Sequence, residues 1–256
     1  MKKERIDKLL VDKGLAPSRE RAQAWVMAGL VFAGGQKVSK ASQTFLPEMN
    51  IEVKGQDHPY VSRGGVKLAG ALDHFQLSVK DWVCLDVGAS TGGFTDCLLQ
   101  RGAKKVYALD VGHNQLAWKI RQDPRVLVIE KVNIRYWEAK ELSEVPQLVV
   151  ADVSFISLSL VIPPLFRLLD NSETFFLCLI KPQFEVGRKD LPSGGVLKDE
   201  AKREEVLQQV LENLKKEGAE LLGSCPSSLP GTEGNLEYFA FFKKKPTKGL
   251  KVALFL

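Results

Sequence analysis

Short apolar runs alternate with helix-type segments from residue 62 to residue 244, and this alternation constrains the fold more than any other feature. The runs that read as strands are 83–87, 105–110, 125–130, 147–152, 174–181, 219–225 and 236–244. Segments with helical spacing of apolar residues lie between them, near 93–101, 114–121, 157–169 and 198–216. This order predicts an α/β, Rossmann-like fold, with a seven-stranded, mostly parallel sheet and helices on both faces.

Charged residues stand where four of the predicted strands end, namely Asp86, Asp110, Asp152 and Lys181. In sheets of this kind, ligands bind beyond the carboxyl ends of the strands, near the point where the strand order reverses. Lys181 is the most informative of the four, because an ammonium group at the mouth of an apolar strand is costly unless something uses it. The sequence therefore predicts a binding site at this edge of the sheet.

The first predicted strand leads into a glycine-rich loop, DVGASTGGFTD, at 86–96. Glycine at 88, 92 and 93 allows a tight turn and a close approach of a ligand. Ser90 stands where a dinucleotide-binding loop needs glycine, and no lysine follows as a phosphate-binding P-loop requires. Asp110 is placed to accept hydrogen bonds from a ribose.

These features indicate a nucleoside ligand without a pyrophosphate, and S-adenosylmethionine (SAM) fits that description. The alternative is purely structural, with glycines that form a tight turn and Asp110 as a helix cap. The predicted cofactor-binding residues are Asp86, Gly88, Ala89, Ser90, Thr91, Gly92, Gly93, Asp110 and Asn133.

Residues 1–54 show a different sequence pattern from the rest of the chain. Two short helical patterns end at Gly14 and Gly29, the second with Ser18 as its N-cap, and a hairpin is predicted to turn at Gly34–Gly35. Arginines at 19 and 21 fall in the first turn of the second helix, where cations oppose the helix dipole. Binding of phosphate would explain them, and a solvated charged face is the alternative.

The order Arg5-x-Asp7-x-x-Leu10, Ser18-Arg19-x-x-Ala22 and Gly35-x-x-Val38-x-Lys40 resembles the small RNA-binding module named after a ribosomal small-subunit protein. That family commonly carries Asn where Gly34 stands, and both residue types tolerate positive φ. The resemblance implies binding to structured RNA. With basic residues elsewhere in the chain, the predicted RNA-binding set is Arg5, Arg19, Arg21, Lys37, Arg63, Arg188 and Lys189.

Four charged residues, Lys67, Asp152, Lys181 and Glu237, resemble the tetrad of the FtsJ-type RNA ribose 2′-O-methyltransferases. With SRGGVKL, DVGASTGGFTD, ADVSFISL, IKPQFE and GNLEYF, the whole chain resembles the TlyA family, also called hemolysin A. The resemblance implies a class I SAM-dependent methyltransferase that modifies the ribose 2′-hydroxyl of cytidine in ribosomal RNA.

The chemistry agrees with these residue types. A ribose hydroxyl must lose its proton as its oxygen attacks a methyl group, and a lysine can accept that proton where burial and a neighbouring cation favour the neutral amine. Lys181 is the predicted base and Lys67 the second cation, while Asp152 and Glu237 orient the amines and balance their charge. No metal is required. Each residue alone has a structural explanation, so the hypothesis needs all four within about 10 Å.

The sequence predicts an RNA-binding module at 1–54, a linker at 55–62 and a methyltransferase domain at 63–256. The Gly- and Pro-rich stretch at 182–198 is expected to fold over the target nucleotide, with Arg188 and Lys189 on phosphate.

Composition limits the alternatives. The chain is 45% hydrophobic and 26% charged with a net charge of +5, its four cysteines lie far apart, and no apolar run approaches the length of a membrane span. A cytoplasmic protein with ribosomal RNA or ribosomal subunits as partner is expected. A non-catalytic RNA-binding or ribosome-assembly protein is the main alternative, and a membrane-active hemolysin is disfavoured.

Overall fold

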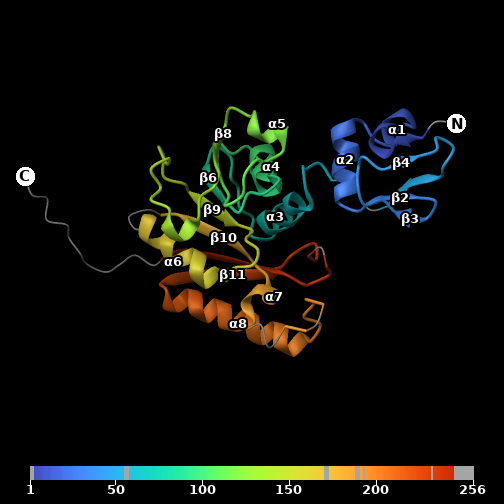
Figure 1. Cartoon of the computed structure of the whole chain (residues 1–256). Coiled ribbons are helices and arrows are strands. Elements are labelled where there is room, and N and C mark those ends of the chain that lie inside the picture. The colour runs from blue at the N-terminus through green and yellow to red at the C-terminus, as the bar shows by residue number, and fades with distance from the viewer. Residues whose placement is uncertain are drawn as a thin grey trace, which may run out of the picture. The chain divides into compact units, whose positions relative to one another are not determined.

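The computed structural model describes residues 3–54, 58–169, 173–187, 191–192, 194–231 and 233–244. The chain divides into two compact units, residues 1–63 and 64–256 (Figure 1). The predicted boundaries, with a separate linker at 55–62, remain a prediction.

The first unit is a small α+β module. It contains β1 (Glu4–Arg5), α1 (Ile6–Asp12), α2 (Arg19–Met27), β2 (Val31–Ala33), β3 (Gln36–Lys37), β4 (Thr44–Phe45) and β5 (Ile51–Val53). Strand β2 pairs antiparallel with β3 and β5, and β1 pairs with β4. A core of apolar side chains from both helices and from β2 and β5 joins these elements.

Two local predictions for this unit are confirmed. The side chain of Ser18 caps α2 by accepting a hydrogen bond from the backbone N–H of Arg21 at 3.2 Å. The β2–β3 hairpin turns at Gly34 and Gly35, whose φ angles of 57° and 78° lie in the left-handed region that favours glycine.

The second unit is built on a seven-stranded sheet with the order β11-β12-β10-β9-β6-β7-β8. The strands are β6 (Val83–Val87), β7 (Lys105–Leu109), β8 (Val126–Ile129), β9 (Leu148–Ala151), β10 (Phe175–Ile180), β11 (Ala219–Pro226) and β12 (Tyr238–Lys244). Strands β6 to β10 are parallel to one another, and β12 is antiparallel to both β10 and β11. The predicted Rossmann-like fold is confirmed.

Helices cover both faces of the sheet (Figure 1). They are α3 (Arg63–His74), α4 (Gly93–Gln100), α5 (Trp118–Arg121), α6 (Leu158–Leu168), α7 (Pro182–Glu185) and α8 (Glu200–Lys216), with a 3-10 turn η1 (Ile134–Tyr136). In α4, Phe94 stacks on Phe239 of β12 with ring centroids 6.0 Å apart. The helix expected near 114–121 is partly wrong, because regular helix begins only at Trp118 and Asn114 has a φ of 55°.

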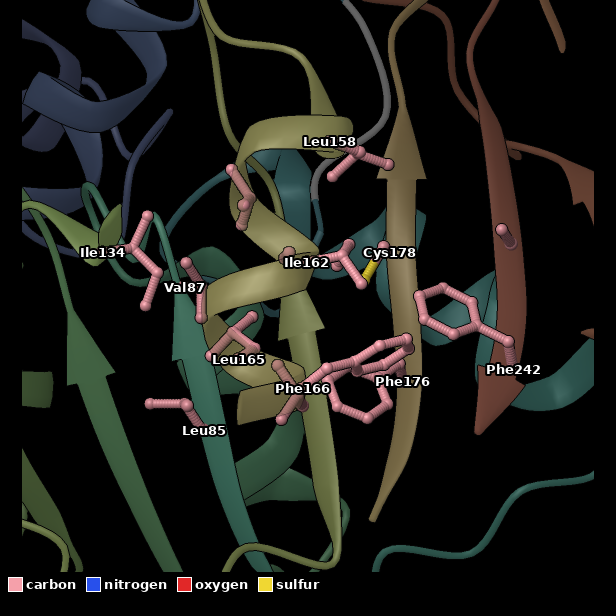
Figure 2. Close-up of a cluster of buried hydrophobic side chains, with 14 of the residues drawn as sticks. Leu85, Val87, Ile134, Leu158, Ile162, Leu165, Phe166, Phe176, Cys178 and Phe242 are labelled. Atoms are coloured by element: carbon pink, nitrogen blue, oxygen red, sulfur yellow. The ribbon is translucent and has the colours of Figure 1, made fainter. Parts of the chain in front are cut away.

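Helix α6 supplies much of the core. Its residues Leu158, Ile162, Leu165 and Phe166 pack with side chains of the central strands (Figure 2). Along the inner strands β6, β7, β9 and β10, alternate residues point to this face and the intervening ones are buried on the other face. This burial on both faces explains their almost continuous apolar sequences.

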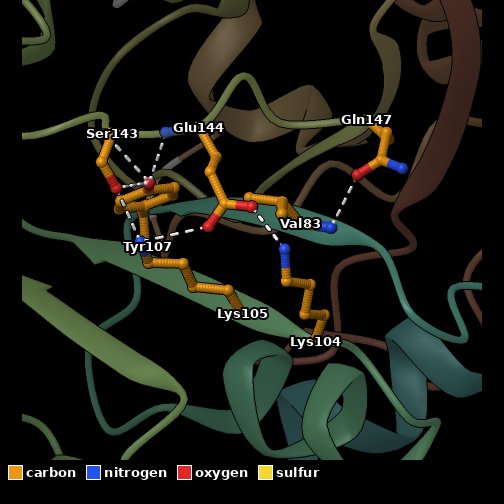
Figure 3. A network of polar contacts seen from close by, with 7 residues as sticks. All are labelled: Val83, Lys104, Lys105, Tyr107, Ser143, Glu144 and Gln147. Carbon is orange, nitrogen blue, oxygen red and sulfur yellow. Dashed lines mark hydrogen bonds and ion pairs between the residues drawn. The ribbon is translucent and has the colours of Figure 1, made fainter.

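A polar network fixes the start of the strands, at the edge opposite the carboxyl ends. The buried hydroxyl of Tyr107 accepts hydrogen bonds from the backbone N–H groups of Ser143 and Glu144 at 3.1 and 3.0 Å (Figure 3). Gln147 accepts one from the N–H of Val83 at 2.8 Å. The irregular chain before β9 is therefore anchored to its neighbours, which stabilises the register of the sheet.

Candidate active site

The strand order reverses between β6 and β9, and the glycine loop lies at this point. Gly88 directly follows β6 with a φ of 84°, and a Cβ atom at this position would lie 2.7 Å from the backbone oxygen of Asp152. The N–H of Asp152 donates to the carbonyl of Val87 at 3.1 Å. Only glycine permits this close approach, and the loop after β6 is thereby held against the end of β9.

The rest of the loop is equally tight. Ser90 has a φ of 48°, Thr91 accepts a backbone hydrogen bond from Ala117 at 3.1 Å, and Gly92 has a φ of 93° as the residue before α4. A Cβ atom on Gly92 would lie 2.8 Å from Leu116. Ala89 is buried, and Gly93 begins the helix.

Asp110 stands beside this loop at the end of β7. Its carboxylate oxygens accept hydrogen bonds from the backbone N–H groups of Ser90 at 2.7 Å and Gly112 at 2.6 Å. Each carboxylate oxygen has a second lone pair, so Asp110 can still accept the hydroxyl groups of a ribose. The carboxylate, the tight loop and the close backbone approach together fit a nucleoside cofactor.

Asp86 lies beneath the loop, fully buried. Its Oδ2 accepts a hydrogen bond from the hydroxyl of Thr95 at 2.6 Å, whereas its buried Oδ1 has no hydrogen-bond partner. Burial raises the pKa of Asp86 to about 7, and the nearby charge of Asp152 contributes to the rise. Asp86 connects β6 to the first turn of α4.

Asn133 caps η1, since its Oδ1 accepts the N–H of Arg135 at 3.0 Å. It also lines a cavity of about 330 Å³ formed by the chain after β8. A contact of Asn133 with the adenine of a cofactor remains a prediction.

Lys181, the residue after β10, forms an ion pair with Asp152, the residue after β9. Lys181 Nζ lies 2.6 Å from Asp152 Oδ1, and the same ammonium donates a hydrogen bond to Ser154 Oγ at 2.9 Å. The side chain of Lys181 is 12% exposed, so the ammonium reaches the surface at the mouth of the strand. The costly lysine noted in the sequence thus has a carboxylate partner.

Lys67 and Glu237 form a second ion pair, which is buried. Lys67 Nζ in α3 donates to Glu237 Oε2 at 2.6 Å, and their side chains are 10% and 2% exposed. The last register pair of β10 and β12 is Ile180 with Tyr238. Glu237 therefore lies opposite Lys181 across the two strands, one residue beyond the last pair, and both ion pairs belong to the same edge of the sheet.

An exposed aromatic side chain beside Lys181 was not predicted from the sequence. Phe155 is 90% exposed and has a φ of 64°, which is unusual for a bulky residue. Its ring centroid lies 4.9 Å from that of Phe184, and Lys181 Nζ lies 5.9 Å from the centroid of the Phe184 ring. In the sequence, Phe155 stands only within the motif ADVSFISL, and no local pattern there indicates that its ring is exposed.

In the first unit, a buried acid organises two of the predicted RNA-binding arginines. Asp7 is fully buried and forms ion pairs with Arg5 at 2.8 Å and Arg19 at 3.1 Å, while Gln23 donates to the same carboxylate at 2.8 Å. The hydrogen bond from Arg5 and the charge of Arg19 lower the pKa of Asp7. The arginine side chains remain 47% and 53% exposed, so both can still reach a ligand.

The other predicted RNA-binding residues differ in their surroundings. Arg21 donates to the backbone carbonyls of Tyr60, at 2.8 Å, and His58. Lys37 is exposed, and its side chain passes over Gly29, where a Cβ atom would lie 2.3 Å from the ammonium. Arg63 begins α3 and is partly exposed. The stretch expected to cover the target nucleotide is described only in part, and Arg188 and Lys189 lie outside the described residues.

Within the described residues, no group of three or more His, Cys, Asp or Glu side chains is arranged to hold a metal ion. The expectation that no metal is needed remains a prediction. In the same part of the chain, no helix combines the length and the apolar character needed to cross a membrane.

The fold and the position of its glycine loop place this chain among the Rossmann-like methyltransferases. Residues 60–244 match the FtsJ-like methyltransferase family, and residues 4–51 match the S4 domain. The chain therefore belongs to the FtsJ-like methyltransferase family and carries an S4 domain at its N-terminal end, as the sequence motifs predicted.

Several proteins are similar to this chain over nearly their whole length. The 16S/23S rRNA (cytidine-2′-O)-methyltransferase TlyA of Mycobacterium tuberculosis is 40% identical over 96% of this chain and 92% of its own. Hemolysin A of Brachyspira hyodysenteriae is 45% identical over 93% of this chain and 99% of its own. A solved structure from Streptococcus thermophilus, which carries a hemolysin name, is 42% identical, covers 98% of this chain and 92% of its own, and superposes with a TM-score of 0.75.

Proposed function

We propose that this protein is a SAM-dependent RNA methyltransferase that modifies the ribose 2′-hydroxyl of cytidine in ribosomal RNA. The observation that carries the proposal is the pair of ion pairs, Lys181–Asp152 and Lys67–Glu237, at the sheet edge that also holds the glycine loop. The TlyA relative supports the choice of substrate, because it is named for this reaction and matches 96% of the chain.

Asp110 and the loop from Gly88 to Gly93 are proposed to hold the cofactor. The free lone pairs of the Asp110 carboxylate accept the ribose hydroxyls, and the glycines admit the cofactor close to the backbone. When bound, SAM supplies the methyl group as part of a sulfonium ion. Asp86 supports the first turn of α4 through Thr95, and it stays in the proposed cofactor-binding set.

Lys181 is the proposed general base. In its neutral form, it accepts the proton of the 2′-hydroxyl at Nζ as the oxygen attacks the methyl group, and Asp152 then stabilises the ammonium that forms. Glu237 fixes Lys67 as a second cation near the reacting oxygen. Alignment of the oxygen with the methyl group provides most of the rate acceleration. The proposal assigns no metal to the transfer.

Phe155 is proposed to stack on the target base or on a neighbouring base. Its ring is 90% exposed, and bases stack on aromatic rings with a gain of about 1–3 kcal/mol. Its position, 4.9 Å from the Phe184 ring that lies beside Lys181, places a base-binding surface next to the proposed base.

The N-terminal unit is proposed to deliver the RNA. Residues 1–54 form the RNA-binding module, 55–62 link it to the methyltransferase domain at 63–256, and Arg5 and Arg19 contact phosphate. Arg21, Lys37, Arg63, Arg188 and Lys189 stay in the proposed RNA-binding set. Ribosomal RNA or a ribosomal subunit in the cytoplasm is the proposed partner.

The experiment is transfer of labelled methyl groups from SAM to ribosomal subunits taken from cells without this protein, with mass spectrometry of the nucleosides. We expect 2′-O-methylcytidine with the wild type and none with Lys181→Ala. Lys104→Ala is the matched control, because Lys104 is an exposed lysine paired with Glu144 and takes no part in the site. Equal product from wild type and Lys181→Ala would contradict the proposed base.

Two outcomes would favour the alternatives. A wild-type protein that binds ribosomal RNA but transfers no methyl group would be a non-catalytic RNA-binding or assembly protein. The hemolysin name of two similar proteins motivates a leakage assay with dye-filled liposomes, in which we expect no release.

A further inference from the structure

The loop after β9 and the short helix α7 are joined by contacts beyond the ion pair of the proposed base. The ammonium of Lys181 donates to Ser154 Oγ at 2.9 Å. The ring of Phe155 packs on that of Phe184 at 4.9 Å. The chain after β9 and the chain after β10 therefore run side by side from the ends of their strands to the start of α6.

Glu185, the last residue of α7, completes this series. Its Oε2 accepts a hydrogen bond from the hydroxyl of Ser157 at 2.6 Å, and its Oε1 accepts one from the backbone N–H of Leu158 at 2.9 Å. Ser157 is the N-cap of α6 and accepts the N–H of Ser159 at 3.1 Å. The N-terminus of α6 is thus held by its own cap and by a carboxylate from another segment.

The local cap would suffice for α6 alone. The N-terminal N–H groups of a helix need acceptors, and a serine at the N-cap ordinarily supplies one from the same segment. Burial raises the pKa of Glu185, so this carboxyl group occupies its place at some cost in solvation. Glu185 stands four positions after Lys181. Its hydrogen bond with the N–H of Leu158 therefore connects the start of α6 to the segment that follows Lys181.

We propose that Glu185 is a positioning residue for methyl transfer, which locks the start of α6 onto α7 and so fixes Lys181 and Phe155 in one arrangement. The inference rests on the proposed function, because it names the residue that holds the proposed base and the proposed base-stacking ring. Glu185 acts through these neighbours and does not itself touch the substrate.

The test uses the full chain with Glu185→Ala, Glu185→Gln, Ser157→Ala and the double variant Ser157→Ala/Glu185→Ala. Single-turnover methyl transfer to ribosomal RNA, SAM affinity by calorimetry and hydrogen exchange of the Leu158 amide are measured for each. Glu217→Gln, at the exposed end of α8, is the control for loss of a carboxylate.

Glu185→Ala is expected to lower the single-turnover rate about 10- to 100-fold, since a displacement of about 1 Å at the reacting groups costs that much. SAM affinity is expected to change less than about twofold, because the cofactor loop follows a different strand. Glu185→Gln retains one acceptor oxygen and is expected to recover part of the rate. In the double variant, the rate losses of the two single variants are expected to combine to less than their product, because the Ser157–Glu185 hydrogen bond that they share is lost only once.

Two results would overturn the inference. One is a Glu185→Ala rate within about twofold of the wild type; the other is a parallel loss of SAM binding, which indicates general unfolding. A wild type without activity would refute the proposed function instead. Hydrogen exchange of the Leu158 amide would still test whether Glu185 holds the start of α6. Unchanged exchange protection in Glu185→Ala would then show that Glu185 does not hold α6.

Discussion

The buried carboxyl group of Asp86 should make the stability of the methyltransferase unit depend on pH. Asp86 is fully buried, with Thr95 as the donor to one oxygen and no partner for the other. Burial is the main reason that its pKa rises from 3.8 to about 7, and the charges of Asp152 and Asp110 add to the rise. The folded protein therefore keeps a proton on this group at pH values where the unfolded chain has lost it.

The sign follows from proton binding. Between the unfolded pKa of 3.8 and the folded pKa of about 7, the folded state binds one proton more, so the free energy of unfolding falls as the pH rises. A shift of about three units corresponds to about 4 kcal/mol, lost in full above the folded pKa. From about pH 5 to about pH 8, the loss is about 3 kcal/mol.

Asp86→Asn should abolish this dependence, because an amide of the same size stays neutral and can still accept the hydrogen bond of Thr95. The assay is urea unfolding without added SAM, followed by tryptophan fluorescence. In a Trp25→Phe background, the remaining tryptophans, at 82, 118 and 137, all belong to the methyltransferase unit. From about pH 5 to about pH 8, we expect the free energy of unfolding of the variant to rise by about 3 kcal/mol relative to that of the wild type.

Asp123→Asn is the matched control. The hydrogen bond from Arg125 lowers the pKa of Asp123, so the stability that it contributes is lost only below the ordinary carboxyl range and is constant over this interval. Wild-type and Asp86→Asn curves that stay parallel from about pH 5 to about pH 8 would refute the reasoning for Asp86.

Three further predictions concern the glycine loop, the arginines paired with Asp7 and the exposed ring of Phe155. Gly88→Ala should abolish SAM binding in calorimetry, because its Cβ would lie 2.7 Å from a backbone oxygen. Gly102→Ala is the control, since Gly102 has a similar φ of 87° but its Cβ would meet only Lys80, at 3.4 Å; it should lose about 1 kcal/mol of stability and keep its SAM affinity. The double variant Arg5→Gln/Arg19→Gln should reduce the slope of log affinity for ribosomal RNA against log salt by about 2, because two phosphate contacts are lost. Lys8 is an exposed lysine paired with Glu4, and the control Lys8→Gln should leave the slope unchanged. Phe155→Ala should raise the KM for RNA by about tenfold or more at unchanged SAM affinity, and an unchanged KM would exclude stacking on the ring.

The sequence was most informative where a residue's role depends on its neighbours in the chain. The strand run 83–87 agrees with the structure at both ends, and the cap at Ser18 and the turn at Gly34–Gly35 are formed as expected. Hydrophobic periodicity and turn chemistry act over a few residues, so one sequence is enough to read them. The helix expected near 114–121 is partly wrong because of a distant contact. His113 and Asn114 are held by Glu130, which lies 17 and 16 residues further along the chain.

Contacts between distant residues could not be read in this way. Asp7 looks like an ordinary acid in the first turn of a helix, and its burial depends on Arg19 and Gln23, which lie 12 and 16 residues away. The arginines in the first turn of α2 were interpreted as phosphate ligands because their placement opposes the helix dipole. Part of that placement is explained by Asp7 instead. The link from Glu185 to Ser157 spans 28 residues and has no pattern in the sequence.

The direction of β12 explains how residues from both ends of the unit meet at one edge. In a parallel sheet, the carboxyl ends of β9 and β10 share an edge, which brings Asp152 and Lys181 together. If β12 were also parallel, the residue at this edge would be the one that follows the strand. Because β12 is antiparallel, its amino end lies at that edge, and Glu237 enters the site before the strand begins.

This arrangement also balances charge. An isolated buried ammonium is strongly unfavourable, and each of the two lysines here has a carboxylate within 2.6 Å. The pair formed with Glu237 lies deep in the protein, whereas the pair formed with Asp152 reaches the surface. The difference lies in the carboxylates, since Asp152 is 23% exposed and Glu237 only 2%. A substrate therefore reaches the pair of Lys181 and Asp152 more readily than the pair of Lys67 and Glu237.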